Sequence, residues 1–205
     1  MATPKEGGRI MSEGMFSGDP RTRWLSEAGD DRNMEILEEF TFTDPAGTVW
    51  RAPVGSIVNG ASIPRPLWSV VGSPYTGDYR RASIVHDVAS AEAGHDQAKR
   101  RAADRMFYHA CRVGGCSVRE ATILNLGVRI GSTWSTVPQW APAAAASGRG
   151  PRVQRFVTEA RVEFDFQHAA EMVLAQGEVD DPLEIERRAD AALTTVTGLD
   201  SIQAP

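Results

Sequence analysis

The segment from Val54 to Gly77 constrains the fold more than any other part of the sequence. It holds four glycines and three prolines. This density excludes a long helix, because proline breaks a helix interior and glycine is unfavourable within one. Two apolar pieces, Ile57-Val58 and Leu67 to Val71, are expected to anchor the segment to the core. We therefore predict a long loop that separates a β part of the chain from a helical part.

The β part is predicted directly before this loop. Residues 35–43 end in apolar/polar alternation, which is typical of a half-buried strand. Asp44-Pro45-Ala46-Gly47 has proline second and glycine fourth, as a type I turn favours. Residues 48–53 return as a second strand. Together these segments predict a β-hairpin.

Helices are predicted after the loop. Asp78 is a candidate N-cap for a helix from Tyr79 to about Ala91, and Asp96 for one reaching about Val113. Ser117 and Glu120 have the spacing of a capping box, which predicts a third helix over residues 118–130. Two more amphipathic helices are expected near the C-terminus, over residues 153–176 and 182–196.

These elements predict an α+β fold that is mainly α. A β-hairpin and a Gly/Pro-rich loop would pack on a helical bundle, with a helical C-terminal extension. The expected organisation is a flexible or partner-ordered arm over residues 1–33, a compact domain over 34–137, a linker over 138–151 and the extension over 152–205.

Charge and hydropathy exclude several function classes. The net charge of −5 argues against general nucleic-acid binding, which needs clustered Lys and Arg. The first 18 residues have no apolar core segment and so do not form a signal peptide. No run approaches the roughly 20 apolar residues that cross a bilayer, so we expect no transmembrane segment.

The two cysteines, Cys111 and Cys116, do not complete a zinc set with other Cys or His residues. A reduced pair is the favoured expectation without evidence of export, and a disulfide is the alternative.

The candidate chemistry centres on His86, Asp87 and Asp104. His86 and Asp87 would diverge by about 100° around one helix, and Asp104 would face His86 from the next, antiparallel helix. An Asp that holds one nitrogen of a His frees the other to act as a base. Asp87 would point to the loop, where backbone carbonyls could complete a site for a calcium-like cation. Such a set suffices for hydrolysis of an ester or amide.

A purely structural interpretation is an alternative of equal weight. His-Asp pairs on helices often make only a structural hydrogen bond, and Asp104 could be ion-paired with Arg100, Arg101 or Arg105.

Four blocks follow one another in the sequence: Val54–Trp68, Gly72-x-Pro74, Ala82–Asp87 and Ala103–Phe107. In the order and spacing of these blocks the chain resembles domain of unknown function 1353, over roughly residues 35–135. Members of that family are common in bacteriophage and prophage genomes. Two positions depart from its usual pattern: Asn59 stands where the family usually has Asp, and no aromatic residue follows His86-Asp87. Asn59 and Ser62 are the loop residues that would face a substrate.

The arrangement of the site is also loosely similar to that of secreted phospholipase A2. That resemblance implies that His86 activates water, Asp87 binds calcium and Asp104 orients His86. The disulfide framework of the animal enzymes is absent.

Two functions are consistent with these features. The first is a virion-associated protein of the tail, neck or baseplate type that retains a His-Asp hydrolase-like site, with other phage structural proteins binding its N-terminal arm and C-terminal helices. The alternative is an active metal-dependent hydrolase of lipid ester or cell-wall amide bonds used in phage entry or lysis. Either would be found in the virion or the host cytoplasm.

Overall fold

A computed structural model describes residues 14–26, 33–60, 63, 67, 77–135 and 150–197. These residues form two small three-stranded sheets and five helices, so the predicted mainly α, α+β fold is confirmed. Among them, no helix has the length and apolar character that a membrane span requires.

Both sheets are antiparallel and draw their strands from residues 15–58. One has the order β1-β4-β5 and the other β2-β3-β6. The strands are β1 (Met15–Phe16), β2 (Thr22–Trp24), β3 (Met34–Ile36), β4 (Phe40–Thr43), β5 (Val49–Ala52) and β6 (Ile57–Val58).

The predicted hairpin is confirmed as β4 and β5, which pair from Phe40↔Ala52 to Thr43↔Val49. Asp44 closes its turn: the N–H of Gly47 donates to the Asp44 carbonyl at 2.9 Å, and Trp50 Nε1 donates to the Asp44 side chain at 2.9 Å.

The predicted arm over residues 1–33 needs correction for residues 14–26. β1 and β2 lie within this range, and each completes one of the two sheets. Strands of two and three residues are too short to show a periodic pattern, so the sequence does not reveal them. Residues 1–13 and 27–32 lie outside the described part of the chain.

Five helices follow: α3 (Arg80–Ala93), α4 (Gln97–Gly114), α5 (Val118–Ser135), α6 (Gly150–Leu174) and α7 (Pro182–Thr197). Asp96 caps α4 by accepting from Lys99 N at 3.1 Å, and Ser117 with Glu120 forms the predicted capping box of α5. The predicted cap of the first helix is wrong. Tyr79 occupies that position without a side-chain cap, because the carboxylate of Asp78 faces Gly115 instead.

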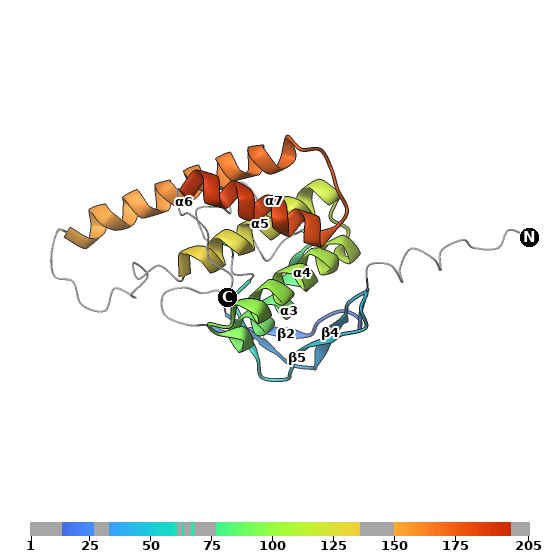
Figure 1. The fold of residues 1–205 in the computed structure, drawn as a ribbon. Helices are drawn as coiled ribbons and strands as arrows, with labels where there is room; N and C mark the ends of the chain where they lie inside the picture. The colour runs from blue at the N-terminus through green and yellow to red at the C-terminus, as the bar shows by residue number, and fades with distance from the viewer. Residues whose placement is uncertain are drawn as a thin grey trace, which may run out of the picture.

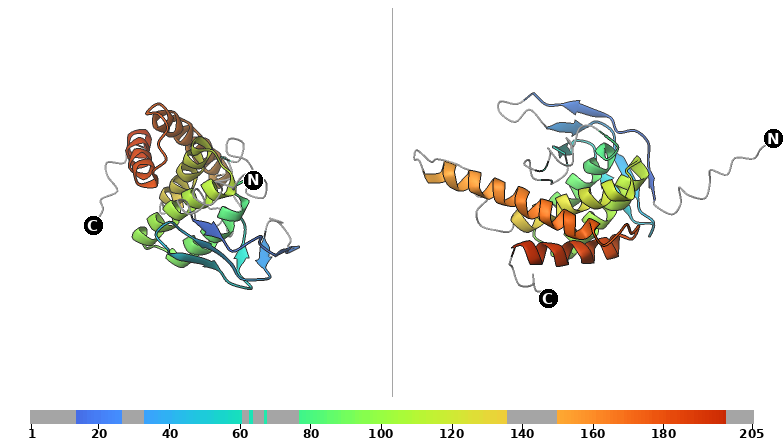
Figure 2. Two further views of the ribbon diagram at one scale, coloured as in Figure 1. Left: turned by 90° about the vertical axis from the view of Figure 1, so that its right-hand side faces the viewer. Right: turned by 90° about the horizontal axis from the view of Figure 1, so that it is seen from above.

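The elements stack in layers, with the sheets on one side, α3, α4 and α5 in the middle, and α6 with α7 on the far side (Figures 1 and 2). α3 contacts β4, β5 and β6, whereas α7 contacts both α4 and α5. One apolar core runs through all layers, from Phe16 and Phe42 in the sheets to Phe166 in α6 and Ile185 in α7. The C-terminal helices are therefore a layer of the bundle that shares its core. Of the predicted linker, residues 138–149 lie outside the described part, and α6 already begins at Gly150.

Candidate functional site

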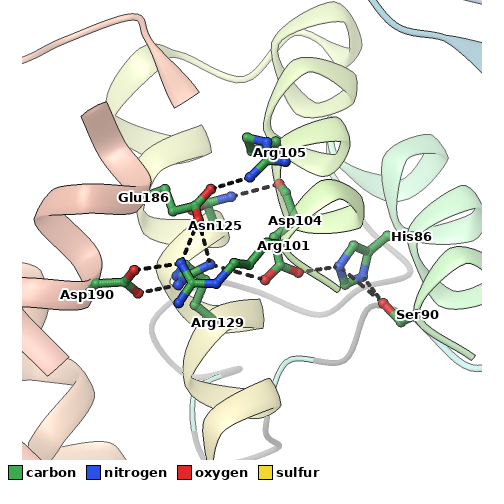
Figure 3. A network of polar contacts seen from close by, with 9 residues as sticks. All are labelled: His86, Ser90, Arg101, Asp104, Arg105, Asn125, Arg129, Glu186 and Asp190. Atoms are coloured by element: carbon green, nitrogen blue, oxygen red, sulfur yellow. Dashed lines mark hydrogen bonds and ion pairs between the residues drawn. The ribbon is translucent and has the colours of Figure 1, made fainter. Parts of the chain in front are cut away.

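His86 on α3 and Asp104 on α4 form a buried pair at the centre of the bundle (Figure 3). His86 Nε2 lies 2.9 Å from Asp104 Oδ1, and the two residues are 0% and 3% exposed. A carboxylate only accepts hydrogen bonds, so Nε2 carries the proton and donates it. Nδ1 of a neutral His86 then holds the lone pair. The antiparallel packing of α3 and α4 thus brings together the two residues that were expected from the sequence to face each other.

Two further side chains adjoin the imidazole of His86. The Phe107 ring lies 4.7 Å from it, centroid to centroid. Ser90 Oγ lies 3.5 Å from Nδ1 and 3.3 Å from Nε2, so the hydroxyl is directed at neither nitrogen alone. Sequence reasoning missed Ser90, although its position four residues after His86 on one helix face could have indicated the contact.

Asp104 has a basic partner other than the ones predicted. Its Oδ2 lies 3.7 Å from Arg129 NH1 on α5, and its main-chain carbonyl accepts from Asn125 Nδ2 at 2.8 Å. Of the arginines expected beside Asp104, Arg101 and Arg105 reach Glu186 instead, each at 2.7 Å. Both arginines are drawn to Glu186 because α4 also contacts α7, a contact between distant parts of the chain.

Arg129 extends the pair into a network that reaches α7. Arg129 is 7% exposed, its guanidinium is paired with Asp190 Oδ1, and Glu186 Oε1 lies 3.9 Å from NH1. Arg101 also binds Asp190, at 2.8 Å. The three arginines on α4 and α5 therefore face three carboxylates, two of them on α7 (Figure 3). Because these charges are opposite and close, they hold the Asp104 side chain in a fixed orientation.

Asp87 contacts the Gly/Pro-rich loop, but through different groups from those predicted. Its Oδ2 accepts from the backbone N–H of Asn59 at 3.0 Å and of Gly60 at 2.7 Å. The predicted contacts for a cation were carbonyl oxygens. No cluster of three or more His, Cys, Asp or Glu suited to a metal occurs among the described residues. Asn59 takes part through its main chain, and Ser62 lies outside the described residues. The calcium site stays a prediction that these contacts do not support.

Burial raises the pKa of Asp87 from 3.8 to about 6, against the opposing effects of His86 and the two loop N–H groups. The folded state then binds the Asp87 proton more tightly than the unfolded state does. We expect this carboxyl to lower the free energy of unfolding as pH rises from about 4 to about 6, by no more than about 3 kcal/mol. Asp87→Asn should remove this pH-dependent part of the free energy of unfolding. Urea titrations of the wild type and the variant at several pH values measure it as the difference between their free energies of unfolding.

Glu120→Gln is the matched control for this titration. Hydrogen bonds from the backbone and side chain of Ser117 lower the pKa of Glu120, so its contribution is lost as pH falls. The two variants should therefore change the pH profile in opposite directions. An Asp87→Asn profile parallel to that of the wild type would contradict the expected titration.

Comparison with known proteins confirms the predicted family resemblance for the central segment. Residues 34–128 match the family described as "Protein of unknown function (DUF1353)". Two Sinorhizobium fredii proteins are each 36% identical to parts of the chain. Uncharacterized protein y4jT aligns over 106 residues, 50% of this chain and 29% of its own length, and uncharacterized protein y4iH over 59 residues, 29% and 25%. The chain thus spans less than a third of either relative. No solved structure matches it significantly.

The matched segment includes His86, Asp87 and Asp104 but ends one residue before Arg129. Glu186 and Asp190 lie far beyond it. Arg129, which pairs with Asp104, and the two α7 carboxylates of the network are therefore contributed from outside the matched segment.

Proposed function

Because residues 34–128 match this family and its His-Asp pair is sealed inside the bundle, we propose that the chain is a virion-associated protein of a bacteriophage tail, neck or baseplate. The pair would be a retained hydrolase-like site with a structural role. The observation that carries this proposal is the complete burial of His86 together with the ion pairing of Asp104. Side chains held in this way stabilise a core, so the protein would act through its surface.

The outer face of the β1-β4-β5 sheet is the surface best suited to bind another subunit. Met15, Thr43 and Val49 lie opposite one another across the three strands. Met15 and Val49 are 59% and 44% exposed, which leaves an apolar row of these two side chains, with Thr43 between them, open to a partner. Exposed apolar surface is a feature of protein–protein contacts, and we propose that this row is part of one. The phage assignment itself rests on the family resemblance.

Incorporation into particles tests this proposal. In a lysogen that encodes the chain, purified virions should contain it in fixed copy number. Val49→Glu should abolish incorporation while leaving the melting temperature unchanged, because it places a charge in the apolar row. Leu183→Glu is the control: Leu183 is 63% exposed on α7, away from the sheets, and its variant should be incorporated normally. Absence of the wild-type chain from intact virions would overturn the proposal.

A metal-dependent hydrolase of lipid ester or cell-wall amide bonds is the second candidate. The observation that favours it is that Asp104 binds Nε2 of His86 and leaves Nδ1 to accept a proton. His86→Gln should then reduce hydrolysis of phosphatidylglycerol micelles or peptidoglycan sacculi, assayed with Ca²⁺, by about 10²-fold or more. His168→Gln, at an exposed histidine of α6, is the control. Equal rates for both folded variants would eliminate this candidate.

A further inference from the structure

We propose that Cys111 and Cys116 form a redox site, in which a small peroxide converts the two thiols into an intrachain disulfide. This inference is independent of the proposed function.

The termination of α4 places the two thiols together. Cys116 N donates to the Cys111 carbonyl at 3.1 Å, and Gly115 N to the Arg112 carbonyl at 3.3 Å. Gly115 has a φ of 118°, in the region that favours glycine. These are the two hydrogen bonds of a Schellman motif. In this motif the side chain at the position of residue 111, in the last turn of the helix, contacts the side chain at the position of residue 116, directly after the glycine. In this chain both residues are cysteines, so the motif places their side chains next to each other.

The two thiols differ in reactivity. The hydrogen bond from Cys111 lowers the pKa of Cys116, with a smaller contribution from Arg112, although burial, Glu120 and Asp78 act in the opposite direction. Burial raises the pKa of Cys111. Cys116 is 4% exposed and lies between the exposed residues Gly115 and Ser117, whereas Cys111 is 0% exposed. Because the thiolate is the nucleophile, Cys116 is the sulfur that reacts first.

The chemistry balances with one molecule of hydrogen peroxide. The Cys116 thiolate attacks one peroxide oxygen, the O–O bond breaks, and water leaves after protonation, which gives a sulfenic acid. The Cys111 sulfur, on losing its proton, attacks the Cys116 sulfur and displaces a second water. Two thiols are thus oxidised by two electrons, and the peroxide is reduced to two molecules of water.

The disulfide would strengthen a junction of several elements. Arg112 NH1 donates to the Cys116 carbonyl at 2.5 Å, and Arg112 NH2 pairs with Asp180, between α6 and α7, at 3.0 Å. Gly114 lies against the Asp78 carbonyl that precedes α3. A bond between Cys111 and Cys116 closes a short ring and fixes the end of α4, so oxidation should raise the melting temperature by roughly 5 °C.

The test uses the full chain with hydrogen peroxide. We expect the wild type to lose both titratable thiols and about 2 Da in intact mass, to stay monomeric on a non-reducing gel, and to recover with dithiothreitol. Cys111→Ser should instead gain about 16 Da at Cys116, and Cys116→Ser should stay unmodified under the same exposure. The proposal would be overturned if the wild type kept both thiols, or if it gained mass without the loss of about 2 Da. Either result is obtained with the wild type alone and does not depend on the folding of the variants.

Discussion

Arg129→Met is expected to destabilise the protein by about 3–5 kcal/mol, one of the two largest effects that the structure predicts. Arg129 is 7% exposed and stands between Asp104 on one side and Asp190 on the other. Methionine fills much of the same volume but leaves the buried Asp104 carboxylate without its cation. Removing one member of a buried ion pair is costly because the remaining charge stays desolvated. Urea unfolding of the wild type and variant measures the difference.

Two further variants separate the effect of charge from that of packing. Arg187→Met removes an exposed arginine that pairs with Glu184 on α7, and it should leave the midpoint of unfolding unchanged. Asp104→Asn combined with Arg129→Met removes both buried charges and should recover part of the lost stability. A loss below about 1 kcal/mol for Arg129→Met alone would show that the network does not stabilise the bundle.

The sequence could predict the His86–Asp104 contact because it depends on local geometry. A short connection at Gly94 makes two helices antiparallel, and residues at similar distances from the turn then meet. The capping residues Asp96, Ser117 and Glu120 act over three positions, so they too can be recognised from spacing alone.

Arg129, Glu186 and Asp190 could not be predicted in the same way. Glu186 lies 85 positions from Arg101, to which it is bound. Such a contact depends on how α7 packs on α4 and α5, and no local pattern encodes that packing. Arg100, Arg101 and Arg105 are nearer to Asp104 in sequence, and this proximity led to the wrong partners. The short strands β1 and β2 were missed for a related reason, because their stability comes from pairing with β4 and β3.

These long-range contacts change the interpretation of the central pair. Considered within residues 34–128 alone, His86 and Asp104 are a base and its orienting acid. With Arg129, Glu186 and Asp190 included, Asp104 is also the inner end of a charged network that joins α3 to α7. A His-Asp pair that also anchors this network can be retained for stability in a chain that catalyses no reaction. Stability and hydrolysis must therefore be measured on the same variants.

Gly114→Ala is expected to destabilise the protein by about 3 kcal/mol, since overpacking against fixed backbone is costly. A Cβ at this position would lie 2.1 Å from the Asp78 carbonyl oxygen. That oxygen belongs to the backbone just before α3, and the adjoining Tyr79 is buried with 5% exposure, so the carbonyl has little freedom to move away. The end of α4 must shift instead, which disturbs the turn that places Cys111 beside Cys116. Thermal or urea unfolding under reducing conditions measures the loss.

Gly127→Ala provides the control, because it makes the same chemical change within α5. There a Cβ would lie 3.4 Å from the Ile63 side chain, which is ordinary van der Waals contact. Alanine is favoured over glycine within a helix by about 1 kcal/mol, so this variant should be neutral or more stable than the wild type. The two substitutions should thus differ by about 4 kcal/mol, although helix propensity treats them alike. If both variants were equally stable, α4 would not approach the start of α3 as closely as the structure shows. The position of the helix end that carries the two cysteines would then also be incorrect.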